Sequence, residues 1–323
     1  MIVITGAGGF IGSNILYHLN QKGLKRIILC DENFKKNNIN KREYLKIVKP
    51  NKLIDYMETK TKIIHAVIHM GANSSTTEKN FKKIYSQNTR FSKNLWNWCS
   101  KNKVRLIYAS SAAIYGDGQS GFDDTDPISI FKPLNYYGWT KYFFDRYAIN
   151  QADKDHSPPQ WVGLRFFNVY GPNEYHKGQM QSVVAHSYNQ YTKEGKVKLF
   201  KSHNKNYKHG HQKRDFIAVS DCVSIILWIL ENPNISGIFN CGTGEARTFK
   251  DLVLAMYTSL KTEPKIIYVN MPENIKKQYQ YYTKAEMKKI KKAGYKNKFI
   301  KLEEGVRDYV TKYLSINSQH RHK

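Results

Sequence analysis

The stretch Gly6-Ala-Gly-Gly9-Phe-Ile-Gly12 decides the fold of this 323-residue chain. It follows the apolar run Met1–Thr5 and opens a segment in which Ile11, Ile15 and Leu19 recur at helical spacing. Glycine is needed where such a turn is tight, where backbone N–H groups approach a pyrophosphate, and where the helix packs against the strand. A GxxGxxG pattern placed between a strand and an amphipathic helix therefore predicts a dinucleotide-binding site.

Short apolar runs alternate with helical patterns through the first half of the chain, which is typical of βαβ units. The predicted strands are Met1–Thr5, Arg26–Cys30, Ala66–Met70, Arg105–Ser110 and Trp161–Asn168. The polar and basic stretch 33–62 shows no clear strand. We expect an α/β fold with a Rossmann-type doubly wound parallel sheet and a smaller, mostly C-terminal substrate-binding domain. The dinucleotide-binding domain should cover 1–167, with 215–241 returning to it; the substrate-binding domain should cover 168–214 and 242–315, before a flexible tail at 316–323.

The formal net charge is +26, from 52 Lys and Arg against 26 Asp and Glu. Such an excess can mark a protein that binds nucleic acid or another anionic surface. However, Lys, Asn, Ile and Tyr are abundant along the whole chain, as an AT-rich coding sequence would produce, and no nucleic-acid-binding module accompanies the charge. We therefore favour a compositional bias and expect no specific nucleic-acid partner.

The four cysteines, Cys30, Cys99, Cys222 and Cys241, are widely spaced and form no CxxC pair. This spacing argues against a zinc site and against a disulfide framework. The sequence has no apolar run of about 18 residues, and its first residues lack the basic region and cleavage site of a signal peptide. These features favour a cytoplasmic protein that does not insert into a membrane.

A second pattern, Tyr137-Gly-Trp-Thr-Lys141, places a phenol and an amine on one face of a helix. It follows Ser111, at the end of a predicted strand. A phenol with its ordinary pKa of about 10 is a poor base near neutrality. An adjacent ammonium and a cationic nicotinamide would both favour the phenolate, and Ser111 would hold the reacting hydroxyl by a hydrogen bond. The pattern predicts hydride-transfer chemistry.

Asp31 ends the second predicted strand about 20 residues after the glycine motif, where a carboxylate usually binds the adenosine ribose. Taken alone, this position favours NAD. Lys35 and Lys36 follow closely, and either could bind a 2′-phosphate. The two cofactors stay open at this point.

With both motifs in place, the chain resembles the extended short-chain dehydrogenase/reductases, a family that includes sugar-nucleotide epimerases, dehydratases and reductases. Within that family, the run from Leu164 to Met180, with His176-Lys177-Gly178, is similar to the ADP-glyceromanno-heptose 6-epimerases. The segments 71–78 and 213–216 and the pair Tyr279-Gln280 agree with that group. The resemblance covers nearly the whole chain.

The resemblance implies that C6″ of ADP-D-glycero-β-D-manno-heptose is inverted through a 6″-keto intermediate, with Tyr137 and Lys177 sharing the acid/base work. It also implies NADP as the cofactor, with NAD still possible, and a homo-oligomer, which is a pentamer in that group. The implied cofactor-binding residues are Gly6, Gly9, Phe10, Ile11, Gly12, Asp31, Glu32, Lys36, Met70, Gly71, Ala72, Asn73, Ser74, Asn88, Lys141 and Val169. The implied substrate-binding residues are Ser111, Asn168, Gln179, His186, Phe200, Lys201, Ser202, Arg214 and Tyr279.

The chain departs from that group at Lys201-Ser202, where the group carries Glu-Gly, and in a loop lengthened by His203–His211. The histidines of this loop are joined by no carboxylate or cysteine, so we expect no metal site. The departures leave another nucleotide-sugar epimerase or reductase, for instance one for a modified heptose, as the alternative. A noncatalytic nucleic-acid-binding protein on a dinucleotide fold is a third hypothesis, which the intact set of Ser111, Tyr137 and Lys141 disfavours.

Overall fold

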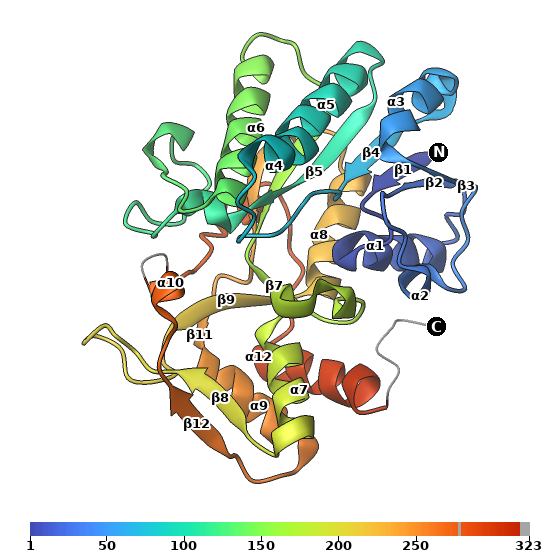
Figure 1. Cartoon of the computed structure of the whole chain (residues 1–323). Helices are drawn as coiled ribbons and strands as arrows, with labels where there is room; N and C mark the ends of the chain where they lie inside the picture. Colours follow the sequence, from blue (N-terminus) through green and yellow to red (C-terminus); the bar gives the residue numbers. More distant parts are fainter. Residues whose placement is uncertain (277–278, 317–323) are drawn as a thin grey trace.

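The computed structural model describes residues 1–276 and 279–316. Its centre is a seven-stranded sheet of order β10-β6-β5-β4-β1-β2-β3, in which all neighbouring strands are parallel (Figure 1). The prediction of an α/β fold with a Rossmann-type parallel sheet is confirmed. The strands are β1 (Ile2–Thr5), β2 (Ile27–Cys30), β3 (Lys46–Val48), β4 (Ala66–His69), β5 (Arg105–Ser111), β6 (Trp161–Phe166) and β10 (Gly237–Cys241).

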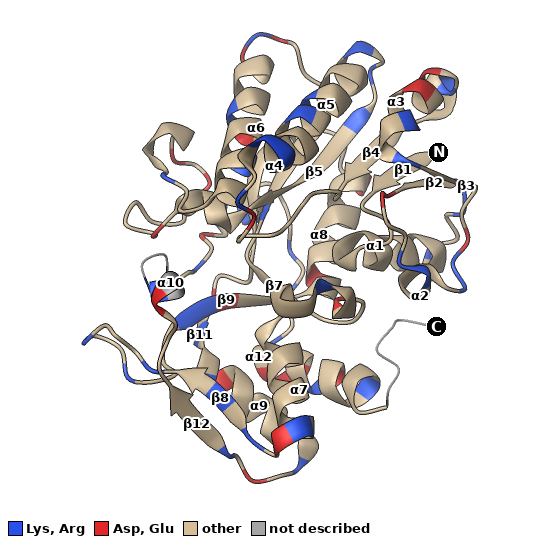
Figure 2. Cartoon of the chain, viewed as in Figure 1, with Lys and Arg blue, Asp and Glu red and all other residues tan. Residues whose placement is uncertain are grey.

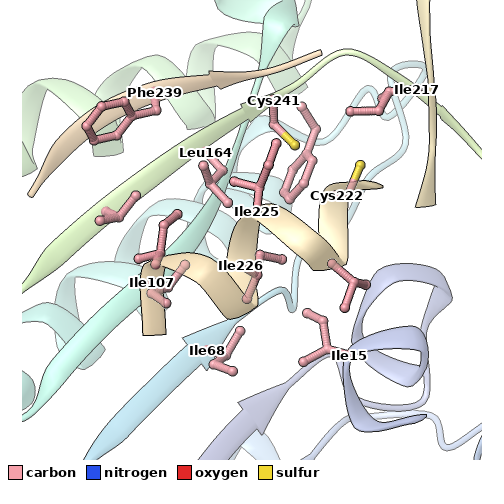
Figure 3. Close-up of a cluster of buried hydrophobic side chains, with 14 of the residues drawn as sticks. Ile15, Ile68, Ile107, Leu164, Ile217, Cys222, Ile225, Ile226, Phe239 and Cys241 are labelled. Atoms are coloured by element: carbon pink, nitrogen blue, oxygen red, sulfur yellow. The ribbon is translucent and has the colours of Figure 1, made fainter. Parts of the chain in front are cut away.

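Helices cover both faces of this sheet because successive strand residues point to opposite sides. Ile68 and Ile107 pack with α1 (Phe10–Gln21) and α8 (Val219–Glu231) in one apolar cluster (Figure 3). Their neighbours Val67 and Leu106 pack in a second cluster, on the opposite face. The helices of that face are α3 (Pro50–Glu58), α5 (Phe91–Lys101) and α6 (Tyr136–Ala152).

The strand predictions differ from the structure by more than one residue in two places. The stretch 33–62 contains β3, an edge strand in which Lys46 and Ile47 are exposed and only Val48 is buried. One buried residue is too weak a signal for a sequence pattern. The predicted strand Trp161–Asn168 is wrong at its end, because the chain leaves the large sheet after β6 and begins β7 (Asn168–Tyr170).

The remaining strands lie below the large sheet in Figure 1. A three-stranded sheet has the order β11-β9-β7, and β12 pairs with β8. Their bounds are β8 (Val197–Phe200), β9 (Lys213–Ala218), β11 (Ala246–Thr248) and β12 (Ile266–Val269). The helices α7 (Val183–Glu194), α9 (Phe249–Leu260) and α12 (Leu302–Tyr309) share a third apolar cluster with these strands.

The segment 215–241 contributes to both parts, since β10 joins the large sheet whereas β9 pairs with β7 and β11. The domain boundaries given above stay a prediction, and residues 317–323 of the predicted tail lie outside the described residues. The other elements are α2 (Lys36–Ile39), α4 (Phe81–Tyr85), α10 (Glu273–Lys276), α11 (Lys288–Lys292), the 3₁₀ turns η1 (Thr61–Ile63), η3 (Ala112–Tyr115), η4 (Ile128–Ile130) and η5 (Tyr175–Met180), and the π-helical turns η2 (Ser86–Arg90) and η6 (Val310–Leu314).

Lys and Arg are spread over many helices, strands and loops (Figure 2). This distribution agrees with a compositional origin of the positive charge. Within the described ranges, no helix is both long enough and apolar enough to cross a membrane.

Asp221, in the first turn of α8, is expected to make stability depend on pH. It is buried, and its carboxylate accepts a hydrogen bond of 2.9 Å from the backbone N–H of Ile300. Burial raises the pKa of Asp221 to about 6, whereas an unfolded Asp titrates at about 3.9. Between these values the folded chain keeps a proton that the unfolded chain has lost, so this group's contribution to stability decreases as the pH rises through the window.

Asp221→Asn should remove this pH dependence and raise the free energy of unfolding above pH 6 by up to about 3 kcal/mol. Urea unfolding at acidic and neutral pH measures both effects, and the difference between wild type and variant cancels the other carboxylates. Parallel pH dependences for the two proteins would contradict the prediction.

Candidate functional site

The glycine-rich turn lies between β1 and α1, where strand order reverses on either side of β1. Gly6 has a φ of +64°, in the left-handed region, and its carbonyl accepts a 3.0 Å hydrogen bond from the N–H of Gly9. A Cβ atom on Gly12 would come within 2.2 Å of the Gly6 carbonyl oxygen. The turn therefore requires glycine for backbone packing, as the motif predicts.

Gly12→Ala should disrupt this turn, because the contact it would create is with backbone and no flexible side chain can yield. We expect a lower melting temperature and a loss of dinucleotide affinity of about tenfold or more. Differential scanning fluorimetry and a dinucleotide titration separate the two effects. A variant with wild-type stability and affinity would show that the turn can relax.

The ends of β1 and β4 lie in close backbone contact beside this turn. A Cβ atom on Gly6 would lie 2.7 Å from the backbone of Gly71, and the N–H of Gly71 donates a 3.0 Å hydrogen bond to Thr5. The predicted cofactor residues Met70, Gly71, Ala72, Asn73 and Ser74 follow β4 at this position. The structure thus brings the glycine turn and the segment 70–74 together.

Asn88, another predicted cofactor residue, is buried in η2 and connects two parts of the site. Its amide accepts a hydrogen bond from the N–H of Asn73 (2.8 Å) and donates to the Asn73 carbonyl (2.9 Å) and to the Thr140 hydroxyl (3.0 Å). π-helical turns are rare and frequently mark functional sites. Asn88 therefore ties the segment 70–74 to α6, the helix that carries Tyr137 and Lys141.

Asp31 lies at the end of β2, beside the glycine-rich turn. Its carboxylate accepts hydrogen bonds from the backbone N–H groups of Gly8 (3.0 Å) and Asn33 (3.3 Å). Burial raises the pKa of Asp31, and these hydrogen bonds oppose the increase. Glu32 and Lys36 are exposed on the following loop and at the start of α2.

Ser111, Tyr137 and Lys141 come together at the ends of β5 and α6. The side chain of Asn135 caps α6 by accepting a 2.9 Å hydrogen bond from the N–H of Gly138. The Ser111 hydroxyl is hydrogen-bonded to the Tyr137 phenol. The Lys141 ammonium lies 5.9 Å from the centre of the Tyr137 ring and donates a 2.7 Å hydrogen bond to the Ala109 carbonyl.

The pKa values of this group differ in part from the sequence-based expectation. Burial raises the pKa of Tyr137, and the hydrogen bond from Ser111 opposes this change. Burial lowers the pKa of Lys141 to about 8, against the effect of Asp145. In the chain itself, desolvation outweighs the Ser111 hydrogen bond, and the predicted depression of the Tyr137 pKa, which also depends on a cationic nicotinamide, stays a prediction. A phenolate at neutral pH requires a further positive charge next to the ring.

Asp145 is a residue of this site that sequence reasoning missed. It is fully buried one helical turn after Lys141, and its carboxylate accepts hydrogen bonds from Ser110 (2.9 Å), Tyr108 (3.2 Å) and Arg165 (3.1 Å). These bonds fix α6 against β5 and β6. The available signal was the i, i+4 spacing from Lys141, which places both side chains on one helix face.

Lys177 lies on η5, and its ammonium is 5.3 Å from the centre of the Phe10 ring. Phe10 is the first residue of α1. Burial lowers the pKa of Lys177, and the carboxylate of Glu174 opposes this change. The loop before η5 is bound to α1, because the Asn14 amide donates to the Pro172 carbonyl (2.9 Å) and the Asn173 amide donates to the Ser13 hydroxyl (3.0 Å). The structure thus places a second partly buried amine against the glycine-rich turn.

Arg214 and Tyr279, both predicted to bind substrate, are in contact. The Arg214 guanidinium lies 5.3 Å from the centre of the Tyr279 ring and 5.5 Å from that of Phe249. Its N–H groups donate to the carbonyls of Lys213 (2.8 Å) and Gln280. Burial lowers the pKa of Arg214, although a guanidinium stays charged at neutral pH.

The other predicted substrate residues lie on neighbouring elements. The His186 ring is 3.1 Å from the Gln179 carbonyl, so α7 and η5 bring this predicted pair together. Phe200 ends β8, and the N–H of Ser202 donates a 3.0 Å hydrogen bond to the ring of His209. Lys201 lies between them, whereas Asn168 and Val169 belong to β7. Over the part of the chain that the structure describes, no three His, Cys, Asp or Glu side chains are grouped to hold a metal ion.

The chain is similar to known proteins in sequence and in structure. Residues 2–242 match the model of the NAD dependent epimerase/dehydratase family. The ADP-L-glycero-D-manno-heptose-6-epimerase of Fusobacterium nucleatum is 44% identical, with 98% of each chain covered. The protein of the same name from Nitratidesulfovibrio vulgaris Hildenborough is 42% identical over 99% of this chain and 100% of its own. The crystal structure of the Helicobacter pylori enzyme of that name is similar with a TM-score of 0.79, at 25% identity, over 96% of this chain and 94% of that chain.

Proposed function

The chain belongs to the NAD-dependent epimerase/dehydratase family, and from this premise we propose that it inverts C6″ of ADP-D-glycero-β-D-manno-heptose to give the L-glycero form. The observation that carries the proposal is the 44% identity, over 98% of both chains, to a protein named for this activity. The two amines in the site support it. Lys141 lies beside Tyr137, and Lys177 lies against Phe10 of the glycine-rich turn.

The residues around the glycine-rich turn fit a nicotinamide dinucleotide. The close approach of Gly6, Gly71 and Gly12 leaves backbone N–H groups free of side-chain bulk, and these suit a pyrophosphate. When bound, the nicotinamide would accept a hydride from C6″ and return it to the opposite face of the carbonyl. Its positive charge in the oxidised form would also favour the Tyr137 phenolate.

We propose NADP as the bound cofactor, with NAD as the alternative. Both oxygens of the Asp31 carboxylate accept backbone N–H groups, from Gly8 and Asn33. Lys35 and Lys36 are exposed close to it, and ammonium groups there could bind a 2′-phosphate. Titration of the apoprotein with NADP and NAD tests the preference. Lys36→Ala should weaken the binding of NADP and leave the binding of NAD unchanged.

Tyr137 would remove the proton of the 6″-hydroxyl during oxidation, while Ser111 holds that hydroxyl by a hydrogen bond. Lys141, whose pKa burial lowers to about 8, would still be mostly protonated at neutral pH and would place a positive charge near the phenol. A single acid/base serves one orientation of the carbonyl, so inversion requires a second group once the exocyclic carbon has turned. Lys177 would supply the proton from its ammonium in that orientation, helped by the burial that lowers its pKa.

Arg214 would bind the diphosphate of the substrate by a bidentate contact that lysine cannot imitate. Tyr279, Gln179 and His186 would line the same side of the site. The further proposed contacts are Asn168, Phe200, Lys201 and Ser202. We also propose a homo-oligomer in the cytoplasm, which analytical ultracentrifugation and cell fractionation can test.

The decisive experiment is to incubate the purified protein with ADP-D-glycero-β-D-manno-heptose and follow the C6″ configuration by NMR. Conversion to a mixture of both epimers, with no net change in the absorbance of reduced nicotinamide, is the expected result. A net absorbance change proportional to turnover would favour a reductase acting on a modified heptose. No conversion in the presence of bound cofactor would refute the proposal.

A further inference from the structure

Glu174 is a buried carboxylate that the proposed mechanism does not use. It is fully excluded from solvent, three residues before Lys177. Its oxygens accept hydrogen bonds from the N–H of Gly171 (3.3 Å), from the hydroxyls of Ser182 (2.7 Å) and Tyr309 (3.0 Å), and from the N–H of Ser182. All of these donors are neutral. A buried carboxylate satisfied only by neutral groups costs stability compared with an apolar side chain, so its presence requires a reason.

The hydrogen bonds of Glu174 close the loop that carries Lys177. The N–H of Lys177 donates to the Glu174 carbonyl (3.0 Å), which begins η5, and Ser182 caps the following helix α7. Between them, Gly178 has a φ of +53° and kinks the chain. The Glu174 carboxylate thus links the start of the segment 174–182 to Ser182 at its end, and its hydrogen bond from Tyr309 attaches the segment to α12.

The opposite side of the same loop is bound to the dinucleotide half of the molecule. Pro172 and Asn173 are hydrogen-bonded to Asn14 and Ser13 of α1, and His176 lies 3.3 Å from the Asn38 amide. The loop is therefore held between α1 on one side and α7 and α12 on the other. A shift at either anchor would move the Lys177 ammonium relative to Phe10.

The two charges also act on each other. The carboxylate of Glu174 raises the pKa of Lys177, and the Lys177 ammonium lowers that of Glu174, while burial acts in the opposite direction on each. The other titratable groups beside this carboxylate are Tyr309 on α12 and Tyr175 on η5, and burial raises the pKa of Tyr309 well above its ordinary value. Lys177 is therefore a group of opposite charge that acts on Glu174 without a direct hydrogen bond to it.

We propose that Glu174 is the positioning residue for Lys177, holding its ammonium against the glycine-rich turn and keeping it available as the second proton donor. The part of this inference that concerns catalysis rests on the proposed function. The part that concerns placement does not, because it follows from the hydrogen bonds of the loop. The test therefore needs one readout of each kind.

The first readout is the reactivity of the Lys177 amine in the full chain. Competitive labelling with acetic anhydride across a pH series, followed by peptide mass spectrometry, measures the pH at which each lysine becomes reactive, with Lys193 as an internal reference. In Glu174→Gln the midpoint for Lys177 should move to lower pH, because the negative charge is lost, while that of Lys193 stays unchanged. An unchanged midpoint for Lys177 would overturn the inference.

The second readout is epimerisation by NMR. Glu174→Gln should lower kcat about 100-fold with KM within about threefold, because a displaced donor affects the reaction more than binding. Tyr309→Phe is the matched control: it removes one hydrogen bond to the same carboxylate but keeps the charge, and its labelling midpoint and pH profile should equal those of wild type. Equal losses of kcat in both variants, without a change of pH profile, would reduce Glu174 to a structural role.

If Glu174→Gln does not fold, Ser182→Ala is the second variant, since it removes one donor and keeps the charge. We expect about a tenfold lower kcat and an unchanged KM, and wild-type kcat would overturn the inference. The outcomes also separate the two proposals. If Glu174→Gln shifts the Lys177 midpoint but the wild-type protein converts no heptose, the proposed function alone is refuted. Conversion by the wild-type protein without a shift in the variant refutes the role of Glu174.

Discussion

Replacing Tyr137 by Phe should lower kcat for C6″ inversion by about 10³-fold, because a general acid/base typically contributes 10²–10⁴-fold and the oxidation at C6″ that begins every inversion passes through this phenol. The variant loses only the hydroxyl, and the ring stays beside Lys141, 5.9 Å from its ammonium in the wild-type chain. Binding of cofactor and substrate should therefore change little. The measurement is the rate of C6″ inversion by NMR, together with KM and the dinucleotide dissociation constant.

Tyr136→Phe is the matched control for this variant. Tyr136 is the preceding residue of α6 and is 46% exposed, with its ring packed against Phe81. Its substitution should leave kcat within about twofold of wild type. If Tyr137→Phe kept more than a tenth of the wild-type kcat, the phenol would not be the proton acceptor, and the buried Lys141 amine would be the next candidate.

The pH profile gives a second check on Tyr137. Burial raises the pKa of the phenol in the chain itself, so activity that depends on a phenolate should increase with pH in the free enzyme. A bound oxidised nicotinamide should move that limb to lower pH. The expected result is a lower pKa for the phenol with oxidised cofactor bound than in the protein without cofactor, which ultraviolet titration of the phenol in both states measures against Tyr137→Phe.

The parts of the site that the sequence predicts are those that depend on short-range spacing. Gly6, Gly9 and Gly12 lie within one turn, and Tyr137 and Lys141 share a helix face, so each group follows from local geometry. The parallel sheet follows from the alternation of apolar runs and amphipathic helices. In each case the residues that determine the feature lie within about a dozen positions of one another, so a local sequence pattern reveals it.

The residues that sequence reasoning missed depend on partners far apart in the chain. Glu174 is hydrogen-bonded to Tyr309, 135 residues away, and Asp145 to Tyr108, 37 residues away. A buried carboxylate looks like an exposed one until its partners are known. The edge strand β3 was missed for a related reason, since a strand with two exposed residues leaves almost no apolar pattern. Tertiary packing, not local preference, determines these features.

Lys177→Met should lower kcat for inversion by about 10²-fold while leaving part of the hydride-transfer half-reaction intact. Methionine keeps the length and the apolar stem that lies near the Phe10 ring but removes the titratable amine. Oxidation through Tyr137 should still occur, whereas return of the hydride to the opposite face would lack its proton donor. Single-turnover absorbance of reduced nicotinamide measures the first step, and NMR measures the inversion.

Lys60→Met is the control, because Lys60 is exposed between α3 and η1 and its loss changes the net charge by the same amount. It should keep wild-type kcat, which separates a local role of Lys177 from any effect of the overall positive charge. Full activity of Lys177→Met would return Lys177 to ordinary surface charge and weaken the heptose assignment, since Tyr137 and Lys141 are shared with dehydrogenases. The selective loss of inversion, with oxidation retained, is the result that distinguishes an epimerase acting at an exocyclic carbon from the other activities of the family.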